Sequence, residues 1–213
     1  INTDFGKGGR DQFLVAAQKL GLKVGADIST DQNQVEFSAA VLRAKQSGSD
    51  VLFAYTNEEE SARLARELRK QGYAKPIVGE ATIISQKAIE LAGDAANGIR
   101  GHVALTVDAP TPAMRAFDEK FQREFKVKSD HNGIQGYSVP YIIKAVSERI
   151  GKVDPKAFNA ALRDLPLYVK DHPGILVDVK FDKNGDPDRA SYIVEIRDGK
   201  QVVLQTLPPN HPF

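Results

Sequence analysis

The first half of the chain alternates between helical spacing and short apolar runs, and this alternation constrains the fold more than any other feature. The run Val51–Tyr55 is continuously apolar and of strand length, as expected for a parallel strand that is covered on both faces. The remaining segments predict helices over 13–20, 37–44, 62–68 and 86–91, and strands over 23–28, 76–79 and 101–107. This order predicts an α/β fold, a doubly wound parallel sheet with right-handed crossovers.

After Pro110 the pattern changes to longer helical segments. Four-residue spacing predicts a helix over 113–125, and a second helix is predicted over Tyr137–Ile150. Asp154 and Pro155 predict the N-cap and first position of a third helix that reaches about Leu165. This part of the chain reads as a helical excursion.

The last segment returns to strands. Alternating patterns over 175–181, 192–196 and 202–204, with the turns DKNGDPD and RDGK between them, predict a small antiparallel meander. We therefore divide the chain into an α/β lobe at 1–108, a helical excursion at 109–165 and strands that return to the lobe at 166–213.

Charge and cysteine content exclude several classes of protein. The formal net charge is only +1, so the charge balance predicts neither a nucleic-acid nor a membrane-surface partner. The absence of Cys excludes disulfides, zinc–thiolate sites and a Cys nucleophile. No apolar stretch approaches the roughly 18 residues that a membrane-spanning helix needs.

The opening segment Asp4–Gly9, DFGKGG, raises the question of nucleotide binding. The dinucleotide fingerprint would need a third glycine at position 11, where the chain has Asp11, and the P-loop pattern is absent. A kinase DFG would need a catalytic loop before it. We interpret the segment as a strand-to-helix turn, which lies beside the ligand site in parallel sheets. A nucleotide-dependent enzyme is therefore the less favoured hypothesis.

The other chemical motifs predict neither catalysis nor a metal or cofactor. The four His residues are dispersed, and no turn of the form G-x-S-x-G occurs. DKNGDPD has its glycine too early for an EF-hand, so a hairpin turn is the better interpretation. Glu58–Glu60 offer paired carboxylates, but acidic residues more often complement the dipole at a helix N-terminus.

Three segments at predicted strand ends remain as a binding site. They are Asp4–Phe5, Tyr55–Glu58 and Glu80–Thr82, which a parallel sheet brings to one edge. Their rings, hydroxyls, amide and carboxylates suit a small zwitterion or another polar organic molecule, although each residue also suits an ordinary loop or cap. The candidate ligand-binding residues are Phe5, Tyr55, Thr56, Asn57, Glu58, Glu80, Ala81 and Thr82.

The stretches DFGKGGRDQFLVAAQKLGLKV, SGSDVLFAYTNEEESARLARELRKQGY, KPIVGE, AIELAGDAANGIRG and GYSVPYIIKAV occur in an order that resembles the branched-chain-amino-acid-type periplasmic binding proteins. The resemblance is to the second lobe of this leucine/isoleucine/valine-binding family. It implies a non-enzymatic protein of two α/β lobes, joined by three crossovers, that closes on a small ligand without a cofactor. It further implies delivery to the permease of an ABC transporter, and a precursor with a signal peptide. The location implied is the periplasm, or the surface of a Gram-positive cell as a lipoprotein.

The resemblance also assigns roles to the candidate residues. The ligand-lining aromatic residue falls on Phe5, and the ligand-contacting loop falls on Tyr55–Glu58. The acidic partner of a ligand ammonium falls on Glu80, or on Ala81 if a gap is placed differently. In the second case the ligand need not be an amino acid. Related lobes also serve as sensors in receptors and regulators, which is the alternative function.

Finally, the resemblance implies that a first lobe lies upstream of Ile1 and that this chain is a piece of a longer protein. The helices at 137–150 and 154–165 would then pack on that lobe through apolar faces. These faces consist of Tyr141, Ile142, Val146, Phe158, Ala161 and Leu162. We therefore expect the isolated chain either to fold these helices back on its own sheet or to bury them against a second copy, and we favour self-association.

Overall fold

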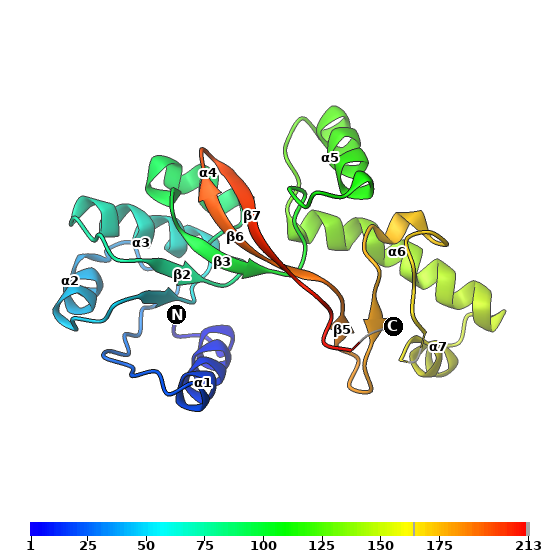
Figure 1. The fold of residues 1–213 in the computed structure, drawn as a ribbon, viewed down its shortest axis with the longest axis horizontal. Helices are drawn as coiled ribbons and strands as arrows, with labels where there is room; N and C mark the ends of the chain where they lie inside the picture. Colours follow the sequence, from blue (N-terminus) through cyan, green and yellow to red (C-terminus); the bar gives the residue numbers. More distant parts are fainter. Residues whose placement is uncertain (164, 212–213) are drawn as a thin grey trace. The chain divides into compact units, whose positions relative to one another are not determined.

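The computed structural model describes residues 1–163 and 165–211, and the chain divides into two compact units. The first unit consists of Ile1–His102 and Val194–Val202. The second consists of Val103–Ile193 and the residues from Val203 on. The chain therefore passes between the units three times (Figure 1).

Three parallel strands form the centre of the sheet: β1 (Leu52–Ala54), β2 (Ile77–Gly79) and β3 (Arg100–Val103). Leu52 lies opposite Ile77, and Val78 lies opposite Arg100. The helix α3 (Glu58–Lys70) connects β1 to β2, and α4 (Gln86–Ala92) with the 3-10 turn η1 (Gly93–Ala96) connects β2 to β3. The α/β class predicted from the sequence is confirmed, although β3 is shorter than the predicted strand over 101–107.

The C-terminal hairpin completes the sheet. The strands β6 (Ser191–Arg197) and β7 (Lys200–Leu207) follow β3 in the order β1-β2-β3-β6-β7. The connecting residues Asp198 and Gly199 have φ values of 48° and 74°. Two successive positive φ values are typical of a type I′ turn, which matches the twist of antiparallel strands. The hairpin predicted at RDGK is confirmed.

The glycine-rich opening segment is helical, and the predicted strand-to-helix turn at Asp4–Gly9 is wrong. The helix α1 (Asp4–Lys19) begins at Asp4, because the Thr3 hydroxyl accepts a hydrogen bond from the Gly6 N–H at 3.2 Å and caps the first turn. A Cβ on Gly6 would lie 1.8 Å from the Ile1 carbonyl oxygen. Glycine at this position thus permits a close approach of two backbone segments inside the helix.

The predicted strand over residues 23–28 is also wrong, because these residues form no ladder. The Ile1 ammonium donates to the Tyr55 carbonyl at 2.9 Å, and the Asn2 N–H donates to the Thr30 carbonyl at 2.7 Å. Among the described residues, no other strand lies along the free side of β1. A segment becomes a strand only where a neighbour supplies donors and acceptors. The next helix of this unit, α2 (Ser38–Gln46), lies where the sequence predicts it.

The second unit contains the helices of the excursion, α5 (Pro112–Phe125), α6 (His131–Ile150) and α7 (Pro155–Leu162). The Asp154 carboxylate accepts from the Ala157 N–H at 2.7 Å, which confirms the predicted N-cap. The helix α6 begins six residues before the predicted start, because Asp130 caps an earlier turn.

The segment predicted as a strand over 175–181 is mostly irregular. Its first residue, Ile175, ends the 3-10 turn η2 (Pro173–Ile175), and only β4 (Lys180–Phe181) is a strand. The strand β4 pairs antiparallel with β5 (Pro187–Asp188) in a separate two-stranded sheet. The predicted single meander is therefore two separate hairpins. Gly185, at a φ of 93°, forms the predicted turn.

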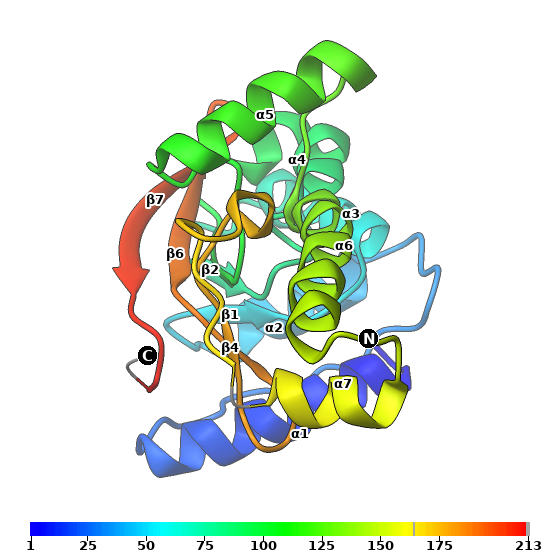
Figure 2. The same cartoon turned by 90° about the vertical axis from the view of Figure 1, so that its right-hand side faces the viewer.

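The apolar faces of α6 and α7 pack against their own chain. The helix α6 contacts α7 and η2 (Figure 2). The buried members of this cluster are Ala145, Val146, Leu165, Leu167, Ile175 and Val179, and Ile142, Phe158, Ala161 and Leu162 pack against them. In the isolated chain these side chains are thus covered by residues of their own unit, and Tyr141, which is 39% exposed, lies with its ring against Gly174.

Candidate functional site

Phe5 and Tyr55 bring two of the predicted segments together in the first unit. Phe5 lies in the first turn of α1 rather than in a loop, and 43% of its surface is exposed. Tyr55 directly follows β1 and is half-buried. The two ring centroids are 4.6 Å apart with the planes tilted by 36°, an ordinary geometry for attractive aromatic pairs. The pair forms an apolar wall with one exposed side.

The hydroxyl of Tyr55 is a partly buried donor that feels the charge of the Glu80 carboxylate. Burial raises the pKa of Tyr55 above its usual value, and the negative charge of Glu80 raises it further. Tyr55 therefore stays protonated at neutral pH. Within the described part of the chain no residue forms a hydrogen bond with this hydroxyl, which leaves its proton available to a bound molecule.

The loop Glu80–Thr82 is tied to the loop after β1. The Thr82 N–H donates to Glu80 Oε1 at 2.9 Å, and the Thr82 hydroxyl lies within hydrogen-bond reach of both the Glu80 carboxylate and the Thr56 carbonyl. These bonds use one oxygen of Glu80 and leave Oε2 without a partner among the described residues. Ala81, between them, is half-buried and carries no polar group. The carboxylate is thus oriented by its own loop.

Thr56 and Asn57 shape the start of α3. Thr56 is 5% exposed, and its hydroxyl pairs with the Ser61 hydroxyl at 2.7 Å. Asn57 occupies the N-cap position of α3 without a capping bond from its side chain, and Glu58 is the first residue of the helix. The Asn57 amide and the Glu58 carboxylate are half-buried near the same edge.

The acidic run at 58–60 opens α3, as the helix-dipole interpretation predicts. Glu59 forms an ion pair with Lys87 at 2.5 Å, which holds its pKa below the usual range. Glu60 is 2% exposed and accepts from the Asn33 N–H at 2.6 Å. These two carboxylates are therefore occupied within the protein, and the run offers no free carboxylate pair for acid–base chemistry.

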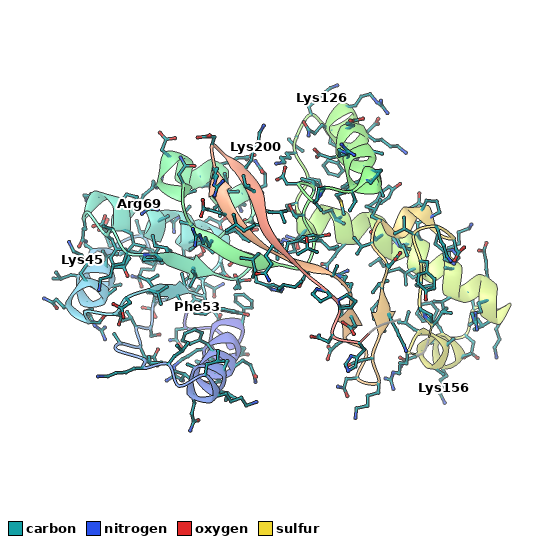
Figure 3. The ribbon with its side chains drawn as sticks, in the orientation of Figure 1. Lys45, Phe53, Arg69, Lys126, Lys156 and Lys200 are labelled. Atoms are coloured by element: carbon teal, nitrogen blue, oxygen red, sulfur yellow. The ribbon has the colours of Figure 1, made fainter. Side chains whose placement is uncertain are left out.

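The aromatic pair that adjoins this site was not predicted from the sequence. Phe13 of α1 stacks on Phe53 of β1 with the ring centroids 4.3 Å apart and the planes 9° apart. Figure 3 shows Phe53 with its side chain directed toward α1. Gly9 lies between Phe5 and Phe13 on the helix, and the ring of Tyr55 lies against it. The four-residue spacing of Phe5, Gly9 and Phe13 is the signal in the sequence that predicts such a stripe.

The structure thus gathers Phe5, Tyr55, Glu80 and Thr82 around an aromatic wall with an adjacent carboxylate. No group of His, Asp or Glu within residues 1–163 and 165–211 is arranged to hold a metal ion. Since Asp4–Gly9 is helical, it forms no loop that could enclose a phosphate. No helix in the described part of the chain is both long and apolar enough to cross a membrane.

Comparisons with known proteins agree on one family. The sequence matches the periplasmic binding protein family over residues 2–201. It is 22% identical over 195 residues to Leu/Ile/Val-binding protein homolog 1 of Brucella abortus, covering 90% of this chain and 50% of the relative. The chain therefore spans about half the length of the curated relatives it matches.

Two solved structures have the same fold at low sequence identity. A leucine binding protein from Thermotoga maritima superposes with a TM-score of 0.83 at 19% identity, over 98% of this chain and 58% of its own. The solute binding protein of an ABC transporter from R. palustris, in complex with benzoate, gives a TM-score of 0.81 at 20% identity, over 93% and 54%.

Proposed function

Because the chain belongs to the periplasmic binding protein family, we propose that it binds a small organic solute for an ABC transporter. The sequence resemblance to branched-chain-amino-acid-type binding proteins is confirmed by the family match and the relatives. The family consists of solute-binding proteins rather than enzymes. Membership also implies a location outside the cytoplasm.

The observation that carries this proposal is the cluster of Phe5, Tyr55 and Glu80. It joins an apolar wall, a protonated hydroxyl and a carboxylate with one unpaired oxygen within one unit. An apolar surface with a few oriented polar groups is the usual composition of a small-molecule site. We assign ligand contact to the predicted set Phe5, Tyr55, Thr56, Asn57, Glu58, Glu80, Ala81 and Thr82. Within this set Thr56 supports the loop through its bond to Ser61.

The charge of the cluster favours a ligand that carries an ammonium group. Glu80 and Glu58 are both near this edge, whereas the cation Lys87 is paired with Glu59 and the Ile1 ammonium donates to the Tyr55 carbonyl. A ligand with only a carboxylate would meet repulsion here, whereas the ammonium of an amino acid would be attracted. The branched side chain or ring of the ligand would lie on Phe5 and Tyr55. We therefore favour an amino acid over a simple aromatic acid.

In the whole protein the ligand would be held between two lobes. Contacts made with both lobes shift an equilibrium between open and closed states, and the closed state is delivered to a membrane permease. We propose the periplasm as the site of action, with a cell-surface lipoprotein in a Gram-positive organism as the alternative. A signal peptide in the precursor belongs to the same proposal.

Calorimetric titration of the chain with leucine, isoleucine, valine and benzoate tests the ligand class. Glu80→Gln should weaken amino-acid binding by about 1.5–3 kcal/mol, the usual range for a hydrogen bond to a charged group. The matched control is Glu36→Gln, because Glu36 is exposed and its side chain forms no bond with the described residues. Equal affinities for the two variants would remove Glu80 from the site. Binding of benzoate without leucine would favour the alignment that places Ala81 at the ammonium position.

We further propose that the isolated chain self-associates through the free side of β1. Val51, which directly precedes β1, is 48% exposed. An unpaired edge next to apolar side chains favours pairing with a second chain. Light scattering across a concentration series should give an average mass that rises above 23.3 kDa. A constant monomer mass would overturn this proposal.

A further inference from the structure

Gly9 occupies the middle of an aromatic stripe on α1. Phe5, Gly9 and Phe13 follow each other at intervals of four residues. Residues at this spacing lie on one face of a helix, one turn above another. The stripe therefore presents a ring, a gap and a second ring along the same side of α1.

The rings that face this stripe come from β1 and the residue after it. Phe53 and Tyr55 are two positions apart, so their side chains lie on the same face of the extended chain. Phe53 stacks on Phe13, and Tyr55 contacts Phe5. The gap at Gly9 thus lies between two ring pairs that join the same two segments.

The ring of Tyr55 fills the gap at Gly9. A Cβ at position 9 would lie 2.3 Å from Cε1 and Cζ of Tyr55 and 2.6 Å from Cε2. It is thus the hydroxyl-bearing end of the ring that lies against the helix backbone. Carbon atoms in contact are normally about 3.5–4.0 Å apart, so the ring has to shift by roughly 1 Å or more to admit a methyl group.

We infer that Gly9 is a positioning residue for ligand binding, because its missing side chain fixes where the Tyr55 ring and hydroxyl lie. The inference rests on the proposed function, in which Tyr55 contacts the ligand. Any side chain at position 9 displaces the ring from α1, separates it from Phe5 and moves the hydroxyl relative to Glu80. The ligand then meets a different wall and a misplaced donor, although no ligand-contacting residue is changed.

Gly8 provides a matched control on the same helix. A Cβ at Gly8 would meet no atom within 4 Å, and both glycines lie inside α1 without a positive φ. Gly8→Ala and Gly9→Ala thus make the same chemical change and bring the same gain in helix propensity. Only the second places a methyl group against Tyr55.

The two variants are compared by titration with leucine and with benzoate. The quantity measured is the affinity of each variant for whichever of the two solutes the parent chain binds. Gly9→Ala should weaken binding about tenfold to a hundredfold, as expected when a contacting group is misplaced by about 1 Å. Gly8→Ala should stay within about twofold of the parent chain. In a Tyr55→Ala background, Gly9→Ala should cause no further loss of affinity, because the new methyl group no longer meets a ring. Equal losses for the two alanine variants would overturn the inference.

Ring resonances of isotope-labelled tyrosine provide a readout that does not depend on a ligand. The chain has 6 Tyr, and Tyr55→Phe identifies the signal of interest. Gly9→Ala should shift the Tyr55 ring signals, whereas Gly8→Ala should leave them in place. If the parent chain binds none of the tested solutes, the ring signals alone decide whether Gly9 positions Tyr55, independently of the proposed function.

A folding defect in Gly9→Ala would also test the inference. If this variant unfolds and the double variant with Tyr55→Ala folds, the clash with Tyr55 is the cause, and the placement of the ring by Gly9 is supported. If the double variant remains unfolded, the methyl group acts through another contact and the inference is wrong.

Discussion

The helices α1 and α3 both belong to the first unit, but they are held in different ways. The 13 residues of α3 include six that are buried, whereas the 16 residues of α1 include only Gly6 and Ala17. Aliphatic burial fixes α3, and ring contacts to β1 and Tyr55 hold α1. The helix beside the candidate site therefore has little core of its own, so its position depends on the rings that line the site.

The strongest test of this comparison removes one leucine from each helix. Leu68 of α3 is 0% exposed, so Leu68→Ala should lower the free energy of unfolding by about 2–5 kcal/mol. Leu14 of α1 is only half-buried, so Leu14→Ala should cost about 1–2 kcal/mol. Urea unfolding of both variants measures the difference. Equal losses would mean that α1 has as much of a core as α3.

A polar contact gives a second, smaller contrast. Glu60→Ala should cost about 1–3 kcal/mol, because it removes a buried side chain and the Asn33 N–H loses its acceptor. The corresponding contact on α1 joins Arg10 to Asp27 at 2.6 Å in an exposed position. Arg10→Ala should leave the unfolding midpoint unchanged. A loss for Arg10→Ala that matches the Glu60 variant would contradict the view that α1 lacks polar anchors.

The ring contacts themselves should contribute less than the buried leucine of α3. Phe13→Leu keeps an apolar side chain but removes the stack on Phe53, which should cost about 0.5–1.5 kcal/mol. Val15→Ala on the same helix is the control, since Val15 is 47% exposed. If thermal unfolding shows the same small loss for both, the stack does not hold α1.

The smallest expected effect is a change in the alkaline pH dependence. The raised pKa of Tyr55 means that the folded chain keeps this proton at a pH where the unfolded chain has already lost it. Its contribution to stability is therefore complete below the unfolded pKa of about 10 and declines as the pH rises through the folded pKa. Tyr55→Phe should make this decline shallower, as measured by unfolding at a series of alkaline pH values. An unchanged slope would show that Tyr55 titrates as in the unfolded chain.

Elements with an internal period were predictable from the sequence. α3, α5 and β1 carry their own pattern of apolar residues, and each lies where the pattern predicts it. The prediction of a strand over 23–28 was wrong because a strand needs a neighbouring strand for its hydrogen bonds. The residues of the segment do not specify whether that neighbour is present. The prediction of a turn at the start of α1 was wrong because glycines disfavour helices on average. Here Gly6 and Gly9 lie inside the helix, where they permit close contacts with other segments.

The position of the candidate site in the fold was predictable from the sequence, but the detailed contacts within it were not. The rule that loops meet at the carboxyl edge of a parallel sheet places Tyr55 and Glu80 together. It does not say that Thr82 occupies one oxygen of Glu80, or that Tyr55 lies on the backbone of Gly9. The first contact is local to the loop, whereas the second depends on small differences in distance between segments far apart in the chain.

The order of strands in the sheet has a consequence for how the chain is made. β3 receives its second neighbour from β6, and next to it the Ile196 N–H donates to the carbonyl of Ile99, the residue before β3, at 2.9 Å. During synthesis the whole second unit up to Ile193 emerges before that neighbour exists. The nascent chain therefore carries an open edge on β3 until its last strands arrive. Closure across so long a loop is expected to be slow, and a chain stalled before Val194 would expose β3 to aggregation or to a chaperone.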